Sequence, residues 1–133
     1  MLKHLFAKWK VEATFVDMTS ADTVAAAIRS ETKLVWIETP SNPLLRCVDI
    51  EACAALAHRA GARAVCDNTF ASPALQSPLA LGCDLAVHAT TKYLGGRSDV
   101  MGGVVVARVD DAAFADVRTA QLYGGAVPSP FED

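Results

Sequence analysis

The chain of 133 residues has few charged side chains and no long apolar run. Charged residues make up 20% and hydrophobic residues 52% of the sequence, which excludes an intrinsically disordered chain. The net charge of -3 leaves no basic stripe to neutralise phosphates and argues against a nucleic-acid partner. No apolar run reaches the roughly 18 residues that a membrane-spanning helix needs, so no membrane partner is expected. One modest domain remains.

The sequence also shows neither a signal peptide nor a cysteine pattern typical of a metal site. The first ten residues, "MLKHLFAKWK", scatter lysines among the apolar positions and lack the apolar core of a signal peptide. The four cysteines form no CxxC pair and have no histidine at ligand spacing: Cys47, Cys53, Cys66 and Cys83. We therefore expect free, mostly buried thiols in a reducing cytoplasm, and no metal site.

Helical and strand patterns alternate along the sequence. Helices are expected at about 2–9, 21–30, 50–61, 74–82 and from Asp110 or Asp111 to about 123. Strands are expected at 11–17, 33–38, 62–66, 84–89 and 100–108. Ser20 and Asp49 are suited to cap the second and third helices, and Gly61 to end the third. Short loops and nearly continuous apolar strands predict an α/β fold with a mostly parallel sheet.

Three polar clusters follow three of the predicted strands. They are "ETPSNP" (38–43), "DNT" (67–69) and "TTK" (90–92). Ligands of such sheets bind beyond the carboxyl ends of the strands, so we expect the three clusters to meet at one edge.

Lys92 lies in the third cluster, ahead of Gly95 and Gly96, which permit close backbone approach. A free lysine amine is protonated at neutral pH, but burial or a cationic neighbour frees its lone pair for attack on a carbonyl. Asp67, at a strand end, needs a cation or a donor as its partner. The pyridinium nitrogen of pyridoxal phosphate is such a cation, and a lysine with an acidic partner is typical of sites for this cofactor.

Each feature also has a simpler interpretation. A loop lysine is most often a solvated charge, and an aspartate after a strand is more often a turn former or a helix cap. His88 is expected to be a core or strand-end residue. Neither GxGxxG nor GxxxxGK[ST] occurs, so nucleotide-binding folds gain little support.

Taken together, three segments closely resemble the Cys/Met-metabolism family of pyridoxal-phosphate enzymes. They are "ETPSNPLLRCVDI", "DNTFASPALQSPLALGCDL" and "TTKYLGGRSDVMGG", and the likeness extends from about Leu5 to Asp133. The family includes cystathionine γ-synthase, cystathionine and methionine lyases, and homoserine sulfhydrylases.

The resemblance implies the three-layer, mostly parallel large domain of fold type I (the aspartate aminotransferase type), present only in part over residues 1–133. It also implies roles for six residues: Lys92 would carry the cofactor, Asp67 would pair with its ring nitrogen, Asn42 would lie by the ring hydroxyl, Thr69 would lie against the ring, Thr91 would bind the phosphate, and Glu38 would support the cluster from behind.

The sequence departs from the family pattern in three ways. Ala89 stands where the family usually has a phosphate-binding serine, and Thr90 is not expected to replace it, because neighbouring residues on an extended segment point to opposite sides. Arg97 stands where a histidine is usual. Family chains are also much longer, and we expect their phosphate loop and small C-terminal domain to lie outside these 133 residues.

The implied activity is transsulfuration of sulfur amino acids, most like cystathionine γ-synthase, in which cysteine replaces the activating group of a homoserine ester. Cystathionine γ-lyase and homoserine sulfhydrylase remain alternatives. Other classes stay open: a lysine-dependent aldolase without the cofactor, and a non-catalytic remnant that binds pyridoxal phosphate. We expect the isolated chain to lack efficient activity. Small amino acids are the expected substrates, and a homo-oligomer, a tetramer in full-length relatives, is the expected assembly.

Overall fold

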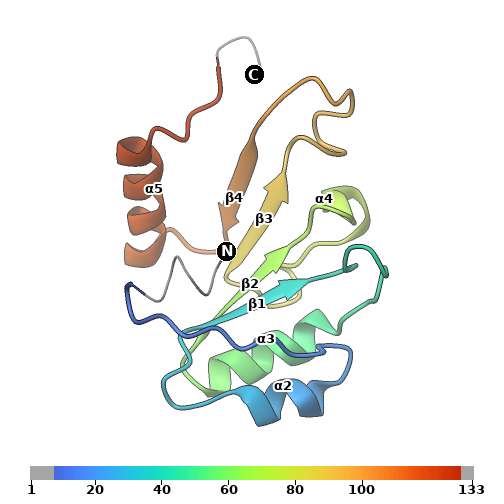
Figure 1. Cartoon of the computed structure of the whole chain (residues 1–133), viewed down its shortest axis with the longest axis vertical. Helices are drawn as coiled ribbons and strands as arrows, with labels where there is room; N and C mark the ends of the chain where they lie inside the picture. Colours follow the sequence, from blue (N-terminus) through green and yellow to red (C-terminus); the bar gives the residue numbers. More distant parts are fainter. Residues whose placement is uncertain (1–7, 130–133) are drawn as a thin grey trace.

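A computed structural model describes residues 8–129 and contains one four-stranded sheet in the order β1-β2-β3-β4. Its strands are β1 (Leu34–Glu38), β2 (Arg63–Asp67), β3 (Leu85–Ala89) and β4 (Gly103–Ala107). The first three are parallel, and β4 runs antiparallel to β3 (Figure 1). The helices are α2 (Ala21–Ala27), α3 (Ile50–Arg59), α4 (Ser72–Leu75) and α5 (Ala112–Gly124). The predicted α/β fold with a mostly parallel sheet is confirmed.

Capping residues explain where the longer helices begin and end. The Asp49 carboxylate accepts a hydrogen bond from the Ala52 amide at 2.9 Å, and the segment after α3 turns at Gly61, whose φ is +71°. The Asp111 carboxylate caps α5 through the Phe114 amide at 3.1 Å. Ser20 occupies the cap position of α2, but its side chain makes no capping hydrogen bond.

The core lies between the sheet and α3. In β1, Val35 and Ile37 are buried while their neighbours are exposed, which is the alternation of a strand covered on one face. The buried cluster also includes Val24, Ile50, Cys53, Ala54, Ala57, Ala64, Cys66 and Cys83. All four cysteines are free, and three of them are buried, whereas Cys47 is exposed.

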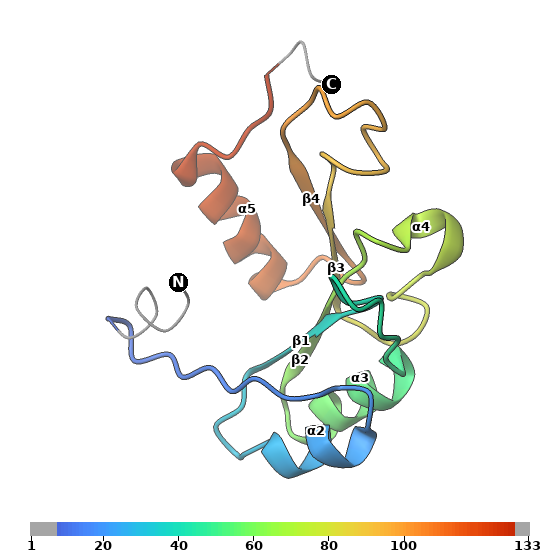
Figure 2. The same cartoon turned by 45° about the vertical axis from the view of Figure 1, so that its right-hand side comes forward.

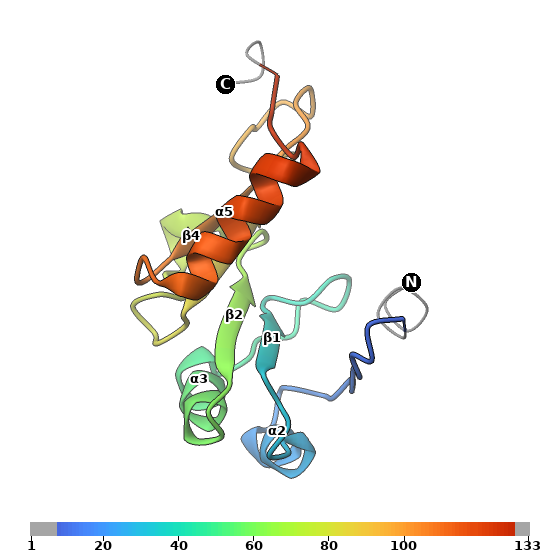
Figure 3. The ribbon, with the colours of Figure 1, turned by 90° about the vertical axis from the view of Figure 1, so that its left-hand side faces the viewer.

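The helices are distributed over both faces of the sheet. Figure 2, in which the sheet is seen nearly edge-on, shows α3 and α4 on one side and α5 on the other. Figure 3 shows α5 beside β4, well away from α2 and α3. No residue of α5 is buried, so this helix adds little to the core.

Several boundaries differ from those predicted. The strand expected at 11–17 is wrong: every residue of the segment except the half-buried Val16 is exposed, and it pairs with no strand among residues 8–129. Its acidic side chains instead form ion pairs, Glu12 with Arg29 at 2.8 Å and Asp17 with Arg46 at 2.9 Å. The helix expected at 74–82 is reduced to α4, because Pro78 has no amide hydrogen to continue a helix and turns follow. Most of the helix expected at 2–9 lies outside the described residues. Among residues 8–129, no helix has both the length and the apolar character needed to cross a membrane.

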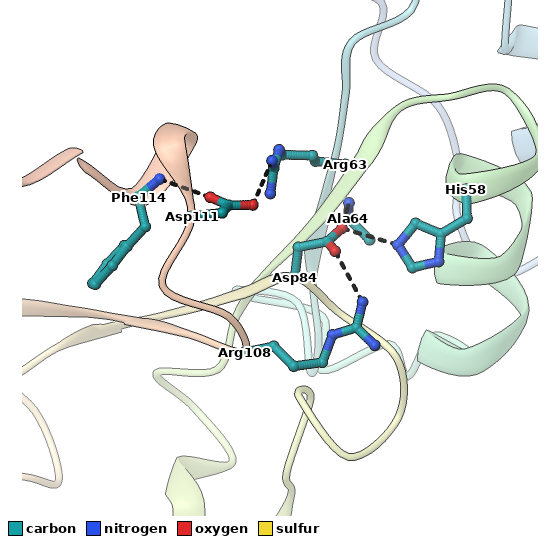
Figure 4. Close-up of polar contacts among 7 residues, drawn as sticks. All are labelled: His58, Arg63, Ala64, Asp84, Arg108, Asp111 and Phe114. Carbon is teal, nitrogen blue, oxygen red and sulfur yellow. Dashed lines mark hydrogen bonds and ion pairs between the residues drawn. The ribbon is translucent and has the colours of Figure 1, made fainter. Parts of the chain in front are cut away.

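A network of charged side chains closes the amino end of the parallel strands (Figure 4). Asp84 accepts hydrogen bonds from His58 Nε2 at 2.9 Å, the Ala64 amide at 2.9 Å and Arg108 at 3.2 Å. Arg63 pairs with the α5 cap, Asp111, at 2.7 Å. Burial alone would raise the pKa of Asp84, but the hydrogen bonds from Ala64, His58 and Arg108 outweigh it and lower the pKa below its ordinary value.

Asp84→Asn is expected to lower the free energy of unfolding at neutral pH by about 1–3 kcal/mol, because it removes the charge that these donors share. The folded-state pKa is depressed, so the contribution is present above the unfolded value of 3.8 and is lost as the pH falls through the folded value. Urea unfolding of parent and variant should therefore differ at neutral pH and converge below pH 3.8. Asp116→Asn, an exposed aspartate on α5, is the matched control and should match the parent throughout.

Candidate functional site

The register of β1 and β2 places two carboxylates side by side at the carboxyl edge of the sheet. Glu38 and Asp67, the last residues of their strands, are direct partners in the ladder. Asp67 is likewise paired with Val87 of β3. Directly paired residues point to the same face, and here it is the face opposite α3, since Val35, Ile37, Ala64 and Cys66 pack towards α3.

Asp67 is held by the turn that follows it. Asp67 Oδ1 accepts hydrogen bonds from the Thr69 amide at 3.0 Å and from the Thr69 hydroxyl at 2.6 Å. The same hydroxyl accepts from the Ala89 amide at 2.8 Å. Thr69 therefore joins the carboxylate at the end of β2 to the end of β3. The loop that carries Lys92, residues 90–102 (the lysine loop), begins at this point.

Glu38 orders the loop that leaves β1. Its Oε1 accepts a hydrogen bond from the Asn42 amide at 3.0 Å. The loop closes on itself, because Ser41 accepts the amide of Leu45 at 2.7 Å and donates its own amide to the carbonyl of Arg46 at 3.0 Å. Glu38 thus reaches the Asn42 backbone, and the Asn42 side chain is exposed at the edge.

The third loop, residues 90–102, is folded around the backbone of Thr90. The Thr90 amide donates to the Gly102 carbonyl at 3.1 Å, and its carbonyl accepts the Gly95 amide at 2.8 Å. The Gly96 amide closes a turn on the Lys92 carbonyl at 2.8 Å. A Cβ on Gly102 would lie 2.7 Å from Thr90 Oγ1, so the Thr90 hydroxyl is packed inside the loop.

The predicted site residues fall into three groups at one edge. Asp67 and Thr69 are in direct contact, and so are Glu38 and Asn42. Thr91 and Lys92 lie on the third loop, and within residues 8–129 no hydrogen bond or ion pair joins either side chain to the two carboxylates. Lys92 is exposed and Thr91 is half-buried.

Sequence reasoning missed a buried amide network behind these groups. Asn68, which is fully buried, and Gln76 exchange two hydrogen bonds: Asn68 Nδ2 donates to the Gln76 carbonyl at 2.9 Å, and Gln76 Nε2 donates to Asn68 Oδ1 at 2.7 Å. Gln76 Nε2 also donates to the carbonyl of Thr39, another buried residue, at 3.1 Å. The only signal for Asn68 in the sequence was its place beside Asp67, and Gln76 carried none.

The donor set fits a cofactor with a cationic ring nitrogen, an aldehyde and a phosphate. Thr69 occupies Asp67 Oδ1, whereas Asp67 Oδ2 has no hydrogen-bond partner within residues 8–129 and is free to accept one. The Lys92 amine has no partner there either, and the Thr91 hydroxyl lies next to it in sequence. A lysine and a carboxylate at one edge of a mostly parallel sheet are typical of pyridoxal-phosphate enzymes.

Comparison with known proteins agrees with this class. The family model described as Cys/Met metabolism PLP-dependent enzyme matches residues 1–133. Cystathionine γ-synthase of Mycobacterium leprae is 46% identical over 134 residues, covering 99% of this chain and 34% of that protein. Cystathionine γ-lyase of Dictyostelium discoideum is 45% identical over 126 residues, covering 95% of this chain and 32% of that protein. The crystal structure of metB from Corynebacterium glutamicum superposes with a TM-score of 0.93 at 47% identity, covering 98% of this chain and 34% of that one.

The chain belongs to the Cys/Met metabolism PLP-dependent enzyme family, whose members act on sulfur amino acids with pyridoxal phosphate as cofactor. It spans about a third of the length of the relatives it matches. The fold expected from the resemblance, part of a pyridoxal-phosphate enzyme's large domain, is confirmed by the superposition.

Gly95→Ala is expected to destabilise the lysine loop. An added Cβ would lie 2.6 Å from Val100 Cγ2 and 2.7 Å from the Thr90 carbonyl oxygen, and the latter belongs to backbone that cannot move aside cheaply. The free energy of unfolding should fall by about 1–3 kcal/mol. Gly124→Ala is the matched control: an added Cβ meets nothing within 4 Å at this last residue of α5, so the same change should be neutral or slightly stabilising. Equal losses in both variants would contradict the packing described for residues 90–102.

Proposed function

We propose that the chain carries the cofactor-binding edge of a transsulfuration enzyme, with the γ-replacement reaction of cystathionine γ-synthase as its activity. The observation that carries the proposal is the carboxyl edge itself, where, among residues 8–129, Asp67 Oδ2 and the Lys92 amine have no hydrogen-bond partner. The substrates would be cysteine and an activated homoserine ester. Several relatives are named cystathionine γ-synthase, among them the one from Mycobacterium leprae.

In this proposal Lys92 would hold the cofactor through its amine and would also move protons at the substrate's Cα and Cβ. When bound, pyridoxal phosphate supplies an electron sink for the substrate carbon. Asp67 would keep the ring nitrogen protonated through Oδ2, and Thr69 fixes the orientation of the carboxylate. Asn42 would contact the ring hydroxyl and Thr91 would bind the phosphate, while Glu38 supports Asn42 through its backbone amide.

The γ-lyase reaction is the second candidate, because a relative named cystathionine γ-lyase has nearly the same identity as the γ-synthase. Within the described edge nothing separates the two, since both start from the same cofactor contacts. An assay of the enzyme extended to the length of its relatives distinguishes them, with a homoserine ester and cysteine in one mixture and cystathionine alone in the other: the first mixture yields cystathionine with a synthase, and the second is consumed by a lyase.

We further propose that the 133 residues alone bind the cofactor without efficient turnover, and that the functional form is a homo-oligomer. Lys92 is exposed in this chain, so water competes for the amine and for any carbonyl that it holds. Ala89 supplies no hydroxyl where the family usually has one. A non-catalytic remnant that binds pyridoxal phosphate is the alternative that these two features favour.

The first test traps the cofactor on the chain. Incubation with pyridoxal phosphate followed by borohydride should place one covalent adduct on Lys92, detected by peptide mass spectrometry. Lys92→Ala should lose the adduct and the visible absorbance. Lys33→Ala is the matched control, because Lys33 is an exposed lysine before β1, and it should retain both. Adduct spread evenly over the lysines, or retained in Lys92→Ala, would contradict the role proposed for Lys92.

Ala89→Ser tests the phosphate side of the site. Ala89 ends β3, and its amide is held by Thr69, so a hydroxyl added there would stand next to the segment that carries Thr91. An added hydrogen bond to a phosphate should tighten pyridoxal-phosphate binding by about tenfold. Dissociation constants from absorbance titration of parent and variant measure the change. Identical constants would require the assignment of Thr91 to the phosphate to be withdrawn.

A further inference from the structure

The side chain of Gln76 connects the two loops that directly follow the acidic residues of the site. Its Nε2 donates one hydrogen bond to the Thr39 carbonyl at 3.1 Å and one to Asn68 Oδ1 at 2.7 Å. Thr39 directly follows Glu38, and Asn68 directly follows Asp67. One amide group therefore connects the residues next to the two carboxylates, each from a different strand.

The partners of Gln76 are themselves fixed. Asn68 is completely buried; its Nδ2 donates back to the Gln76 carbonyl at 2.9 Å, and its amide donates to the Val87 carbonyl of β3 at 2.9 Å. Thr39 is 1% exposed, and its hydroxyl accepts the Val48 amide at 3.0 Å. The two hydrogens of the Gln76 amide are both used, so a side chain without them leaves two buried oxygens unpaired.

The Gln76 network connects onward to the lysine loop. Asn68 lies between Asp67 and Thr69, and the Thr69 hydroxyl reaches the Ala89 amide at 2.8 Å. A movement of Asn68 would therefore displace Asp67 and loosen the end of β3, three residues before Lys92. Gln76 itself stands just after α4, and among residues 8–129 its side chain makes no direct hydrogen bond to Glu38, Asp67 or Lys92.

We infer that Gln76 is a positioning residue for the cofactor site, acting through Thr39 and Asn68 to hold the ends of β1, β2 and β3 in place. The inference rests on the proposed function where it concerns pyridoxal phosphate, and on the hydrogen-bond geometry alone where it concerns the loops. The test therefore needs one readout that depends on the cofactor and one that does not.

Gln76→Glu keeps the shape of the side chain and removes the amide hydrogens. Gln76→Met keeps its length without adding a charge, and serves as the second variant in case the buried carboxylate prevents folding. Gln121→Glu, the same change at an exposed position on α5, is the matched control. Circular dichroism establishes that each protein is folded before it is compared.

The cofactor-independent readout is amide hydrogen exchange in the full chain. The amides of Asn42, Asn68 and Ala89, which are bonded to Glu38, Val87 and Thr69, should exchange at least tenfold faster in both Gln76 variants. Amides within α3 should keep their rates. Gln121→Glu should match the parent at every position.

The cofactor readout is the dissociation constant for pyridoxal phosphate, which should rise about tenfold in both variants, because binding must then also order loops that Gln76 no longer holds. A parent chain that binds no cofactor at Lys92 would contradict the proposed function. The amide exchange rates would then be the only test of whether Gln76 holds the loops. Unchanged exchange at the three amides would overturn the inference. So would an equal acceleration throughout α3, or loss of the fold in both variants, since Gln76 would then support the whole domain and not the site.

Discussion

The parallel pairing of β1, β2 and β3 is the constraint on which the site depends. Because the three strands run in one direction, their carboxyl ends lie at one edge, and the three polar loops leave from it. The register matters as much as the direction. A slip of one residue in β2 would turn Asp67 towards α3, and Cys66, which is fully buried, to the open face.

Local signals predicted those elements whose stability is local. Asp49 was predicted as a helix cap, and the last helix was predicted to start at Asp110 or Asp111. Asp49 and Asp111 each accept the amide expected of a cap. The alternation of apolar and polar residues at 11–17 is typical of a strand. A strand also needs a neighbouring strand to pair with, and no local pattern tells whether one is available. Pro78 was the overlooked signal against a helix at 74–82.

The same distinction applies to the site. Glu38, Asp67 and the third loop could be assigned to one edge because strands that alternate with helices along the sequence run in parallel. The resemblance then supplied the roles, which composition and spacing could not. Gln76 could not be found in this way, because its partners, Thr39 and Asn68, become its neighbours only when β1 and β2 pair. Long-range hydrogen bonds of side-chain amides leave no periodic trace in a sequence.

The two ends of the sheet use the same residue type for different purposes. At the amino end both oxygens of Asp84 are engaged: Oδ1 by Arg108, and Oδ2 by His58 and the Ala64 amide. At the carboxyl end, among residues 8–129, Asp67 accepts hydrogen bonds through Oδ1 alone, from Thr69, and the Thr69 hydroxyl accepts in turn from the Ala89 amide. A carboxylate with both oxygens engaged by protein donors stabilises the fold and is poorly placed to bind a ligand. A carboxylate that is oriented through one oxygen and open at the other is ready to bind a cation, and in this chain that condition is met where the three loops meet.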